Sequence, residues 1–373
     1  MTEKKIIHFR EERKKGKNIW SVGSIRRKAV GKALTVFMAG CLLTGCVSAG
    51  TSGTGAGESG EEQDQERISV VTTIFPQYDF VREIAGDLVD LKMLLKPGEE
   101  THSYEPTPQD IIAIQKSDVF IYVGGENDAW VEDILESMPE SQMRTLRLMD
   151  CVDTVEEEYV EGMDGAAGHS HDHEEEHDHE DGDEHEEGES VHEIDEHVWT
   201  SPVNASAIVA DIAQLLSQTD PENRTVYEEN AAAYEEKLAE LDARFHDIVD
   251  SADRNLLVFG DRFPFRYFAD EYGLEYYAAF PGCASDTEPS AATIAFLINK
   301  VRDEQVPAVL KMELSSDNIA SAIAEATGTE VRTFYSCHNL SAEDFENGEN
   351  YLSMMEKNAE TLKEVLNDGS DQM

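Results

Sequence analysis

Eight of the twelve histidines of this chain lie in one acidic stretch, residues 164–197. Imidazole is a good ligand for zinc, copper and nickel, so clustered histidines in a short tract indicate transition-metal binding. Asp and Glu fill most of the positions between them, and a segment this polar cannot bury enough surface to offset the entropy of ordering. We therefore expect a solvated, disordered loop that collects metal weakly, unless it is only a tolerated low-complexity insertion. The histidines are His169, His171, His173, His177, His179, His185, His192 and His197.

Two runs of alternating strands and helices must position any ordered metal site. Strands separated by helices favour a mostly parallel sheet, so we expect an α/β fold with two similar α/β lobes. The predicted strands are Ile68–Ile74, Leu91–Leu95, Val119–Val123, Leu256–Phe259, Tyr276–Phe280, Val309–Met312 and Val331–Phe334. The predicted helices are Tyr78–Ala85, Pro108–Gln115, Phe265–Tyr272, Ser290–Val301, Ser316–Thr327 and Tyr351–Leu366.

A long helix is predicted between the two lobes. Asp220 suits the N-cap and Pro221 the first helical position. Apolar or small residues then recur at alternating spacings of four and three, which indicates a helix of about 28 residues, roughly 42 Å long. Such a helix could join both lobes rigidly, although it could also pack on one lobe only. The residues of this stripe are Tyr227, Ala231, Tyr234, Leu238, Leu241, Phe245 and Ile248.

The N-terminal segment has the features of an export signal. Residues 1–32 are basic, and the apolar run Ala33–Leu43 is too short to span a membrane but has the length of a signal-peptide core. It ends in Leu43-Thr44-Gly45-Cys46, which resembles the bacterial lipobox. The resemblance implies cleavage before Cys46 and lipidation of that residue; the alternative is an ordinary signal peptide with an incidental cysteine. Residues 46–67 are then a flexible tether.

Charge and cysteine content restrict the possible partners. The chain has a net charge of −48, and since residues 1–45 carry eleven basic and three acidic side chains, the remainder carries −56. A surface this acidic repels nucleic-acid phosphates and favours cations. Beyond Cys46, only Cys151, Cys283 and Cys337 remain, so at most one internal disulfide can form, with Cys283–Cys337 as a possible pair.

Three further segments carry a family resemblance. They are Thr72–Asp87, containing Thr-Thr-Ile-Phe-Pro-Gln-Tyr-Asp-Phe, Pro97–Pro108, containing Pro-Gly-Glu-Glu-Thr-His-Ser-Tyr-Glu-Pro, and Asp195–Pro202, Asp-Glu-His-Val-Trp-Thr-Ser-Pro. Each is weak alone, but their order and spacing resemble the metal-binding lipoproteins of bacterial zinc and manganese ABC transporters. The His-rich loop immediately before His197 resembles the zinc branch of that family. The resemblance covers nearly the whole chain after the signal peptide.

The resemblance implies a metal site between the lobes, with His102 and His197 as two ligands. The residues agree, because His102 follows a Pro-Gly turn beyond a strand and ligands of open α/β sheets bind at the carboxyl ends of strands. His197 lies where apolar, structured chain resumes. Two neutral imidazoles from different loops would form half of a zinc site.

The ligands of the second lobe depart from the family pattern. Family members take a third ligand, His or Glu, from the loop after the first strand of that lobe, where this chain has Gly260, Asp261 and Arg262 but no His. Asp261 is our candidate because a carboxylate oxygen can bind zinc, although it could instead pair with Arg262 or Arg266. The loop before the last helix offers His338, with Cys337 as an alternative. Imidazole and thiolate both favour zinc over manganese.

The implied function is that of a lipid-anchored substrate-binding protein, not an enzyme. It would bind Zn²⁺, with Mn²⁺ less favoured, on the extracytoplasmic face of the cell membrane and deliver it to an ABC permease with its ATPase. We expect a monomer and no nucleic-acid partner. The alternatives are a surface adhesin or metal store, and a zinc hydrolase, which would need a general base beside a metal-bound water. The chain contains no Gly-x-Ser-x-Gly segment around a nucleophile.

The sequence thus predicts the following division of the chain. Residues 1–45 are a lipoprotein signal peptide, 46–67 a tether, 68–163 the N-terminal lobe, 164–196 the disordered loop, 197–219 the end of the N-terminal lobe, 220–250 the connecting helix and 251–373 the C-terminal lobe.

Overall fold

The computed structural model describes residues 67–100, 104–138, 141–164, 193–284 and 288–367, within the compact unit Asp64–Met373. The predicted signal peptide, the lipidation site Cys46, His102 and the histidines from His169 to His192 lie outside the described residues. Within the described part, no helix is both long enough and apolar enough to cross a membrane.

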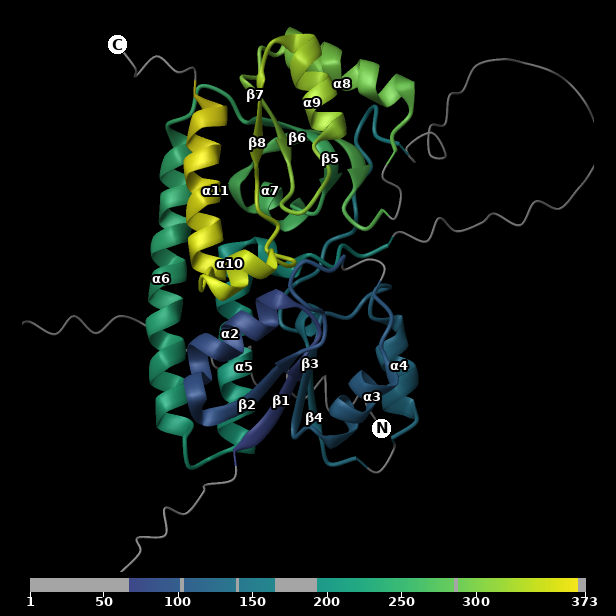
Figure 1. The fold of residues 1–373 in the computed structure, drawn as a ribbon. Coiled ribbons are helices and arrows are strands. Elements are labelled where there is room, and N and C mark those ends of the chain that lie inside the picture. Colours follow the sequence, from purple (N-terminus) through teal and green to yellow (C-terminus); the bar gives the residue numbers. More distant parts are fainter. Residues whose placement is uncertain (1–66, 101–103, 139–140, 165–192, 285–287, 368–373) are drawn as a thin grey trace, which may run out of the picture. The chain divides into compact units, whose positions relative to one another are not determined.

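The first lobe is built on a four-stranded parallel sheet with the strand order β2-β1-β3-β4 (Figure 1). The central strands β1 and β3 are apolar and were predicted, whereas the edge strand β4 has the polar sequence Arg-Thr-Leu-Arg and was missed. The elements are β1 (Ile68–Thr72), α2 (Phe75–Ala85), η1 (Gly86–Leu88), β2 (Val89–Met93), α3 (Pro108–Lys116), β3 (Val119–Tyr122), α4 (Ala129–Glu136), β4 (Arg144–Arg147) and η2 (Leu148–Asp150).

The second lobe repeats the same sheet order with four later strands, β6-β5-β7-β8, again all parallel. Two sheets of the same order confirm the predicted pair of similar α/β lobes. The elements are β5 (Leu256–Phe263), α7 (Arg266–Tyr272), β6 (Glu275–Pro281), α8 (Ala291–Asp303), β7 (Ala308–Lys311), α9 (Asn318–Thr327), β8 (Glu330–Thr333), α10 (Ala342–Glu346) and α11 (Tyr351–Leu366).

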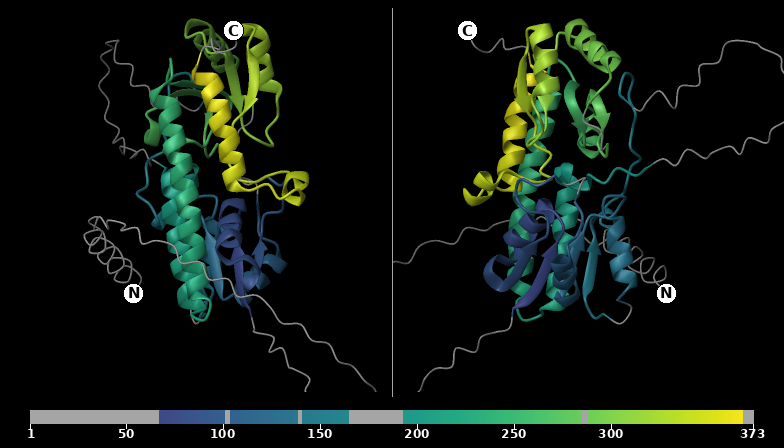
Figure 2. Two further views of the ribbon diagram at one scale, coloured as in Figure 1. Left: turned by 90° about the vertical axis from the view of Figure 1, so that its left-hand side faces the viewer. Right: turned by 45° about the vertical axis from the view of Figure 1, so that its right-hand side comes forward.

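The connecting helix α6 (Arg224–Asp250) has 27 residues and buries the predicted apolar stripe. It packs against α2 and α5 (Pro202–Thr219) of the first lobe and against α7 and α11 of the second. Figure 2 shows α6 and α11 side by side. The helix therefore contacts both lobes, and the alternative of packing on one lobe only is excluded.

The predicted start of this helix was wrong. Asp220 ends α5, since its backbone N–H donates to the Leu216 carbonyl, and α6 begins only at Arg224. The Asp220 carboxylate instead accepts hydrogen bonds from the Asn223 amide, at 2.6 Å, and the Tyr227 hydroxyl, at 2.8 Å. The Asp-Pro pair thus forms the turn between two helices, a role that suits both residue types as well as an N-cap does.

Order also extends into the stretch predicted to be disordered. Ile194 forms an antiparallel bridge with Glu156, and Asp195 and Glu196 are buried. At the other end, the Asp164 backbone N–H donates to the Ala279 carbonyl at 3.0 Å. The loop predicted from acidic composition was therefore too long at both ends, because Asp164 and residues 194–196 belong to the ordered fold.

Buried aromatic residues join the two lobes in one core. Phe80 of α2 meets Tyr351 of α11 edge to face at 5.0 Å between ring centroids. The Tyr351 hydroxyl donates to the Trp199 carbonyl at 2.8 Å, and the Trp199 indole N–H donates to the Ser336 carbonyl at 2.9 Å. Trp199 is two residues from His197, and Ser336 is two residues from His338. This core therefore fixes the positions of the two histidine-bearing segments relative to each other.

Candidate metal site

His197 is fully buried just before the short helix η4 (Val198–Thr200). Both its backbone N–H and its Nδ1 lie within hydrogen-bond distance of Oδ1 of Asp195, at 2.8 and 2.9 Å. An ionised carboxylate only accepts hydrogen bonds, so Nδ1 carries the proton and Nε2 presents its lone pair. A carboxylate behind an imidazole in this way orients a metal ligand and raises its basicity.

Close packing fixes the Asp195–His197 turn in place. The Asp195 carbonyl accepts a hydrogen bond from the Tyr267 hydroxyl of α7 at 2.7 Å, which ties the turn to the second lobe. A Cβ at Gly282 would lie 3.0 Å from Cε1 of His197, a tighter contact than most Cβ atoms make, so this glycine gives the ring room. A Cβ at Gly125 would lie 2.4 Å from a carboxylate oxygen of Glu196. The missing Cβ of Gly125 therefore leaves room for the Glu196 side chain.

His338, from the loop after β8, meets His197 across the lobes. Their ring centroids are 4.7 Å apart with the planes nearly perpendicular, and both rings contact Trp199 edge to face. The Phe75 backbone N–H donates to the His338 carbonyl at 3.4 Å, so this loop also touches the chain just after β1. Of the predicted ligands among the described residues, His197 and His338 are the pair that the fold brings together.

A buried carboxyl group supports the His338 loop from behind. Glu313 accepts hydrogen bonds from the backbone N–H and the hydroxyl of Ser336, at 2.7 and 2.8 Å, and Ser336 Oγ lies 3.3 Å from Nδ1 of His338. Burial raises the pKa of Glu313 to about 7. Glu313 therefore supports the His338 loop through Ser336.

The chain that leads to His102 lies against the His338 loop, although His102 itself is outside the described residues. The Asn339 side-chain amide donates to the carbonyls of Lys96 and Glu99, at 2.8 and 2.9 Å, and the Gly98 N–H donates to the Leu340 carbonyl at 2.8 Å. These bonds pin the Pro-Gly turn to residues adjoining His338. A small cavity there, about 30 Å³, is lined by His338, Glu100, Arg262 and Glu313 among others.

Asp261, our predicted third ligand, is engaged elsewhere. Its Oδ1 accepts a hydrogen bond from the Arg262 backbone N–H at 2.8 Å and its Oδ2 one from the Met312 N–H at 3.0 Å. It lies in a register shift of β5 between Phe259 and Arg262, where the carboxylate satisfies backbone donors that the ladder leaves open. Gly260 is also structural, since a Cβ there would lie 2.7 Å from the backbone of Ala320.

Arg262 was considered only as a partner of Asp261, and the structure places it in the small cavity. Its guanidinium pairs with Oε1 of Glu100 at 3.1 Å and donates to the Ala284 carbonyl at 3.3 Å. The residue after the predicted ligand Asp261 is therefore a cation that reaches Glu100 of the first lobe. A sequence pattern offers no signal for this contact, because Glu100 and Arg262 are far apart in the chain.

The cysteines are not suited to the roles considered for them. Cys283 and Cys337 both carry free thiols, so the possible disulfide between them is not formed. Cys337 is fully buried, and burial raises its pKa well above the usual value. A thiol held protonated in this way is a poor metal ligand, because metals bind the thiolate.

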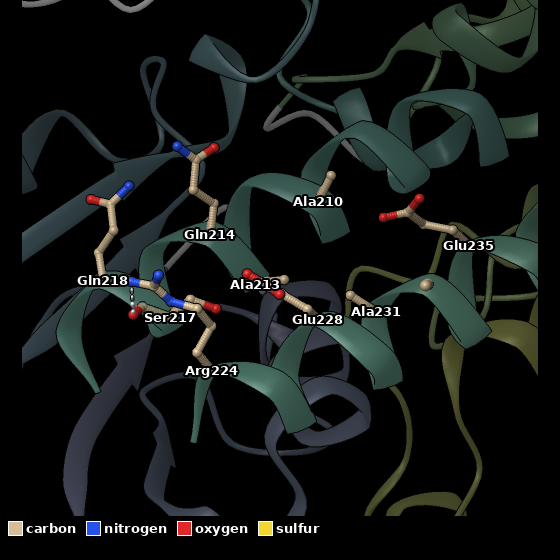
Figure 3. Close-up of a pocket in the computed structure, with 10 residues that line it drawn as sticks. Ala210, Ala213, Gln214, Ser217, Gln218, Arg224, Glu228, Ala231 and Glu235 are labelled. Atoms are coloured by element: carbon tan, nitrogen blue, oxygen red, sulfur yellow. Dashed lines mark hydrogen bonds between the residues drawn. The ribbon is translucent and has the colours of Figure 1, made fainter. Parts of the chain in front are cut away.

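A larger cavity, about 400 Å³, lies between α5 and α6 (Figure 3). Its lining consists of alanines, amides and charged side chains such as Gln214, Arg224 and Glu228, without imidazole or thiol. The volume of a cavity therefore does not identify the metal site; the metal-ligating side chains that line the cavity do.

Comparison with known proteins agrees with this geometry. The family model described as "Zinc-uptake complex component A periplasmic" matches residues 70–365. The zinc-binding lipoprotein AdcA of Streptococcus pneumoniae (strain R6) is 32% identical over 307 residues, 82% of this chain and 57% of AdcA. The high-affinity zinc uptake system protein ZnuA of Bacillus subtilis (strain 168) is 31% identical over 329 residues, 88% of this chain and 96% of ZnuA. The Zn(II)-bound ZnuA-like domain of S. pneumoniae AdcA superposes with a TM-score of 0.64 at 29% identity, covering 81% of this chain and 100% of that domain. This chain thus spans just over half the length of the AdcA relatives that it matches.

Proposed function

This chain belongs to the ZnuA family of zinc-uptake components, and we propose that it captures Zn²⁺ outside the cytoplasmic membrane for an ABC transporter. The observation that carries the proposal is the meeting of His197 and His338 from different lobes, with Asp195 orienting the His197 ring. Imidazole nitrogens suit zinc better than manganese, which prefers oxygen ligands.

We propose His102, His197 and His338 as the zinc ligands. His102 enters this set because the turn before it is hydrogen-bonded to the residues that follow His338. Asp261 leaves the set because both of its oxygens accept backbone hydrogen bonds. Since each imidazole must be neutral to bind metal, zinc affinity should fall at acidic pH.

The proposed role is binding and release of zinc as cargo, without a chemical step. The partners are a membrane permease and its ATPase, Cys46 carries the lipid anchor, and the protein acts as a monomer. The histidines from His169 to His192 bind metal weakly and pass it to the cleft, by which we mean the proposed site of His102, His197 and His338 between the lobes. The proposed division of the chain is the predicted one, with the connecting helix starting at Arg224 and the loop narrowed to residues 165–192.

To test the proposal, the full chain is incubated with equal concentrations of zinc and manganese and then with increasing concentrations of a chelator. Metal analysis measures which metal stays bound. At chelator concentrations that remove metal from the His-rich tract, the wild type should retain one more zinc ion per chain than His197→Ala. His192→Ala, which alters only the His-rich tract, is the matched control and should retain as much as the wild type. Preferential retention of manganese, or equal retention by wild type and His197→Ala, would contradict the proposal.

A growth experiment separates uptake from the other functions considered. Cells that lack the gene should grow poorly in zinc-depleted medium, and the wild-type gene, but not His197→Ala, should restore growth. Normal growth without the gene would instead favour an adhesin or metal store. Zinc-dependent turnover of ester, peptide or phosphate substrates that His197→Ala abolishes would favour a hydrolase.

A further inference from the structure

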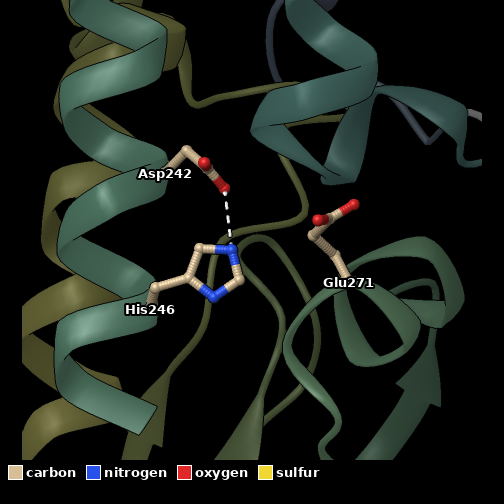
Figure 4. A group of neighbouring side chains, drawn as sticks. All are labelled: Asp242, His246 and Glu271. Carbon is tan, nitrogen blue, oxygen red and sulfur yellow. Dashed lines mark ion pairs between the residues drawn. The ribbon is translucent and has the colours of Figure 1, made fainter. Parts of the chain in front are cut away.

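A second group of metal-ligating side chains lies outside the cleft, where α6 meets α7. Asp242 and His246 are one turn apart on α6, and Glu271 comes from α7. One ligand atom from each lies within 4.8 Å of the others. Figure 4 shows the imidazole and the two carboxylates turned toward the space between the two helices. Residues four apart lie on the same helix face, so Asp242 and His246 can chelate one ion together.

The two helices that carry these groups are held together by a buried aromatic cluster. Phe245 packs edge to face on Phe268 at 4.9 Å and contacts Tyr272 at 5.3 Å. His246 also meets Tyr272 edge to face, at 5.0 Å. Side chains that project from rigid, well-packed helices keep their spacing, which is the condition for a preformed site.

A hydrogen bond also orients one of the carboxylates. The Tyr272 hydroxyl donates to Oδ1 of Asp242 at 2.9 Å, and the same oxygen lies 3.7 Å from Nε2 of His246. Supporting hydrogen bonds of this kind are typical of metal-binding carboxylates. Arg244 and Arg266, on the same two helices, form ion pairs with Glu360 and Asp270.

We propose that Asp242, His246 and Glu271 form a second zinc site on the surface, independent of the cleft. One imidazole and two carboxylates suit Zn²⁺, and ligand bonds of 2.0–2.2 Å require donor atoms about 3.5 Å apart, which small side-chain rotations achieve here. Half of the His246 side chain is exposed, so water can complete the coordination and the ion can exchange. Zinc bound here links α6, which contacts both lobes, to the second lobe.

The test is the reaction of His246 with diethyl pyrocarbonate in the full chain, with the modified peptide quantified by mass spectrometry. This readout reports on His246 alone, so zinc in the cleft or on the His-rich tract does not obscure it. Saturating zinc should slow the modification of His246 at least about tenfold. In Glu271→Gln, the zinc concentration for half-maximal protection should rise by about tenfold or more, comparable with the effect of changing groups around known metal sites.

Two variants keep the result unambiguous. Asp247→Asn changes an exposed neighbour on α6 outside the group and should leave protection unchanged. His338→Ala alters the cleft and should also leave it unchanged, which separates this site from the proposed transport site. Equal modification rates with and without 1 mM zinc, protection unaltered by Glu271→Gln, or protection lost in His338→Ala would each overturn the inference.

Discussion

Two aspartates adjacent to the cleft, Asp195 and Asp261, have the same side chain and different tasks. Asp195 accepts hydrogen bonds from the ring and the backbone of His197 and so serves the proposed zinc ligand. Within the part of the chain that the structure describes, Asp261 accepts its hydrogen bonds from backbone N–H groups and serves the irregular end of β5. The difference shows that the nearest available donors, not the residue type, decide whether a carboxylate near a metal site belongs to that site.

The largest effect is expected from removing the ligand that Asp195 supports. His197→Ala should weaken zinc binding by more than about 100-fold, beyond the 10–100-fold typical of changes around a metal site. Competition with a fluorescent zinc chelator measures this change. Circular dichroism must show native helix content, because the ring is fully buried.

His338→Ala should also weaken zinc binding, by more than about tenfold. The loss tests whether His338, and not Asp261, is the ligand that the second lobe supplies. The same chelator competition measures it. An affinity equal to that of the wild type would return Asp261 to consideration as the ligand of the second lobe.

Asp195→Asn should reduce zinc affinity by about 10–100-fold, because the amide no longer fixes the Nδ1-protonated form of His197. Asp195→Glu, which keeps the charge but moves it, is the companion variant and should recover part of the affinity. If Asp195→Asn binds zinc like the wild type, the carboxylate has no role in orienting the ring.

Asp261→Asn should change zinc affinity by less than about threefold, and should instead lower the free energy of unfolding by about 1 kcal/mol through one weakened hydrogen bond. Chelator competition and urea unfolding on the same preparation measure both quantities. A loss of affinity as large as that of Asp195→Asn would mean that Asp261 is a ligand after all.

Asp79→Asn should leave zinc affinity unchanged and alter only the pH dependence of stability. Asp79 is fully buried in α2, pairs with Arg82 and accepts a hydrogen bond from the Tyr351 N–H of α11 at 2.8 Å. Burial raises its pKa from 3.8 to about 6, in spite of Arg82. The folded state therefore favours the protonated form, and this contribution to stability is complete below pH 3.8 and is lost as the pH rises through 6.

The asparagine variant has no such loss. Its stability relative to the wild type should improve between pH 4 and pH 7, by on the order of 2 kcal/mol. Urea unfolding at several pH values measures the trend. A difference between the two proteins that does not vary with pH would mean that Asp79 is ionised throughout.

Much of the fold could be predicted from local patterns in the sequence. Alternating apolar strands and helices indicated two parallel-sheet lobes, and the apolar stripe from Tyr227 to Ile248 indicated the long helix. The edge strand β4 could not be predicted, because its partly exposed residues do not need an apolar pattern. The start of α6 was missed because Asp220 and Pro221 suit a turn between helices as well as a helix start.

By itself, the sequence determined the fold class and the family, and it singled out His197 as a candidate ligand, because hydrophobic period and motif order are local properties of the chain. The tertiary structure decided which side chains meet. It placed His338 beside His197 and paired Arg262 with Glu100. It also let the Asp195 carboxylate bind the His197 imidazole, whereas the Asp261 carboxylate binds backbone N–H groups. These pairings depend on distances between segments up to 162 residues apart, where a displacement of an ångström decides which donor an oxygen accepts.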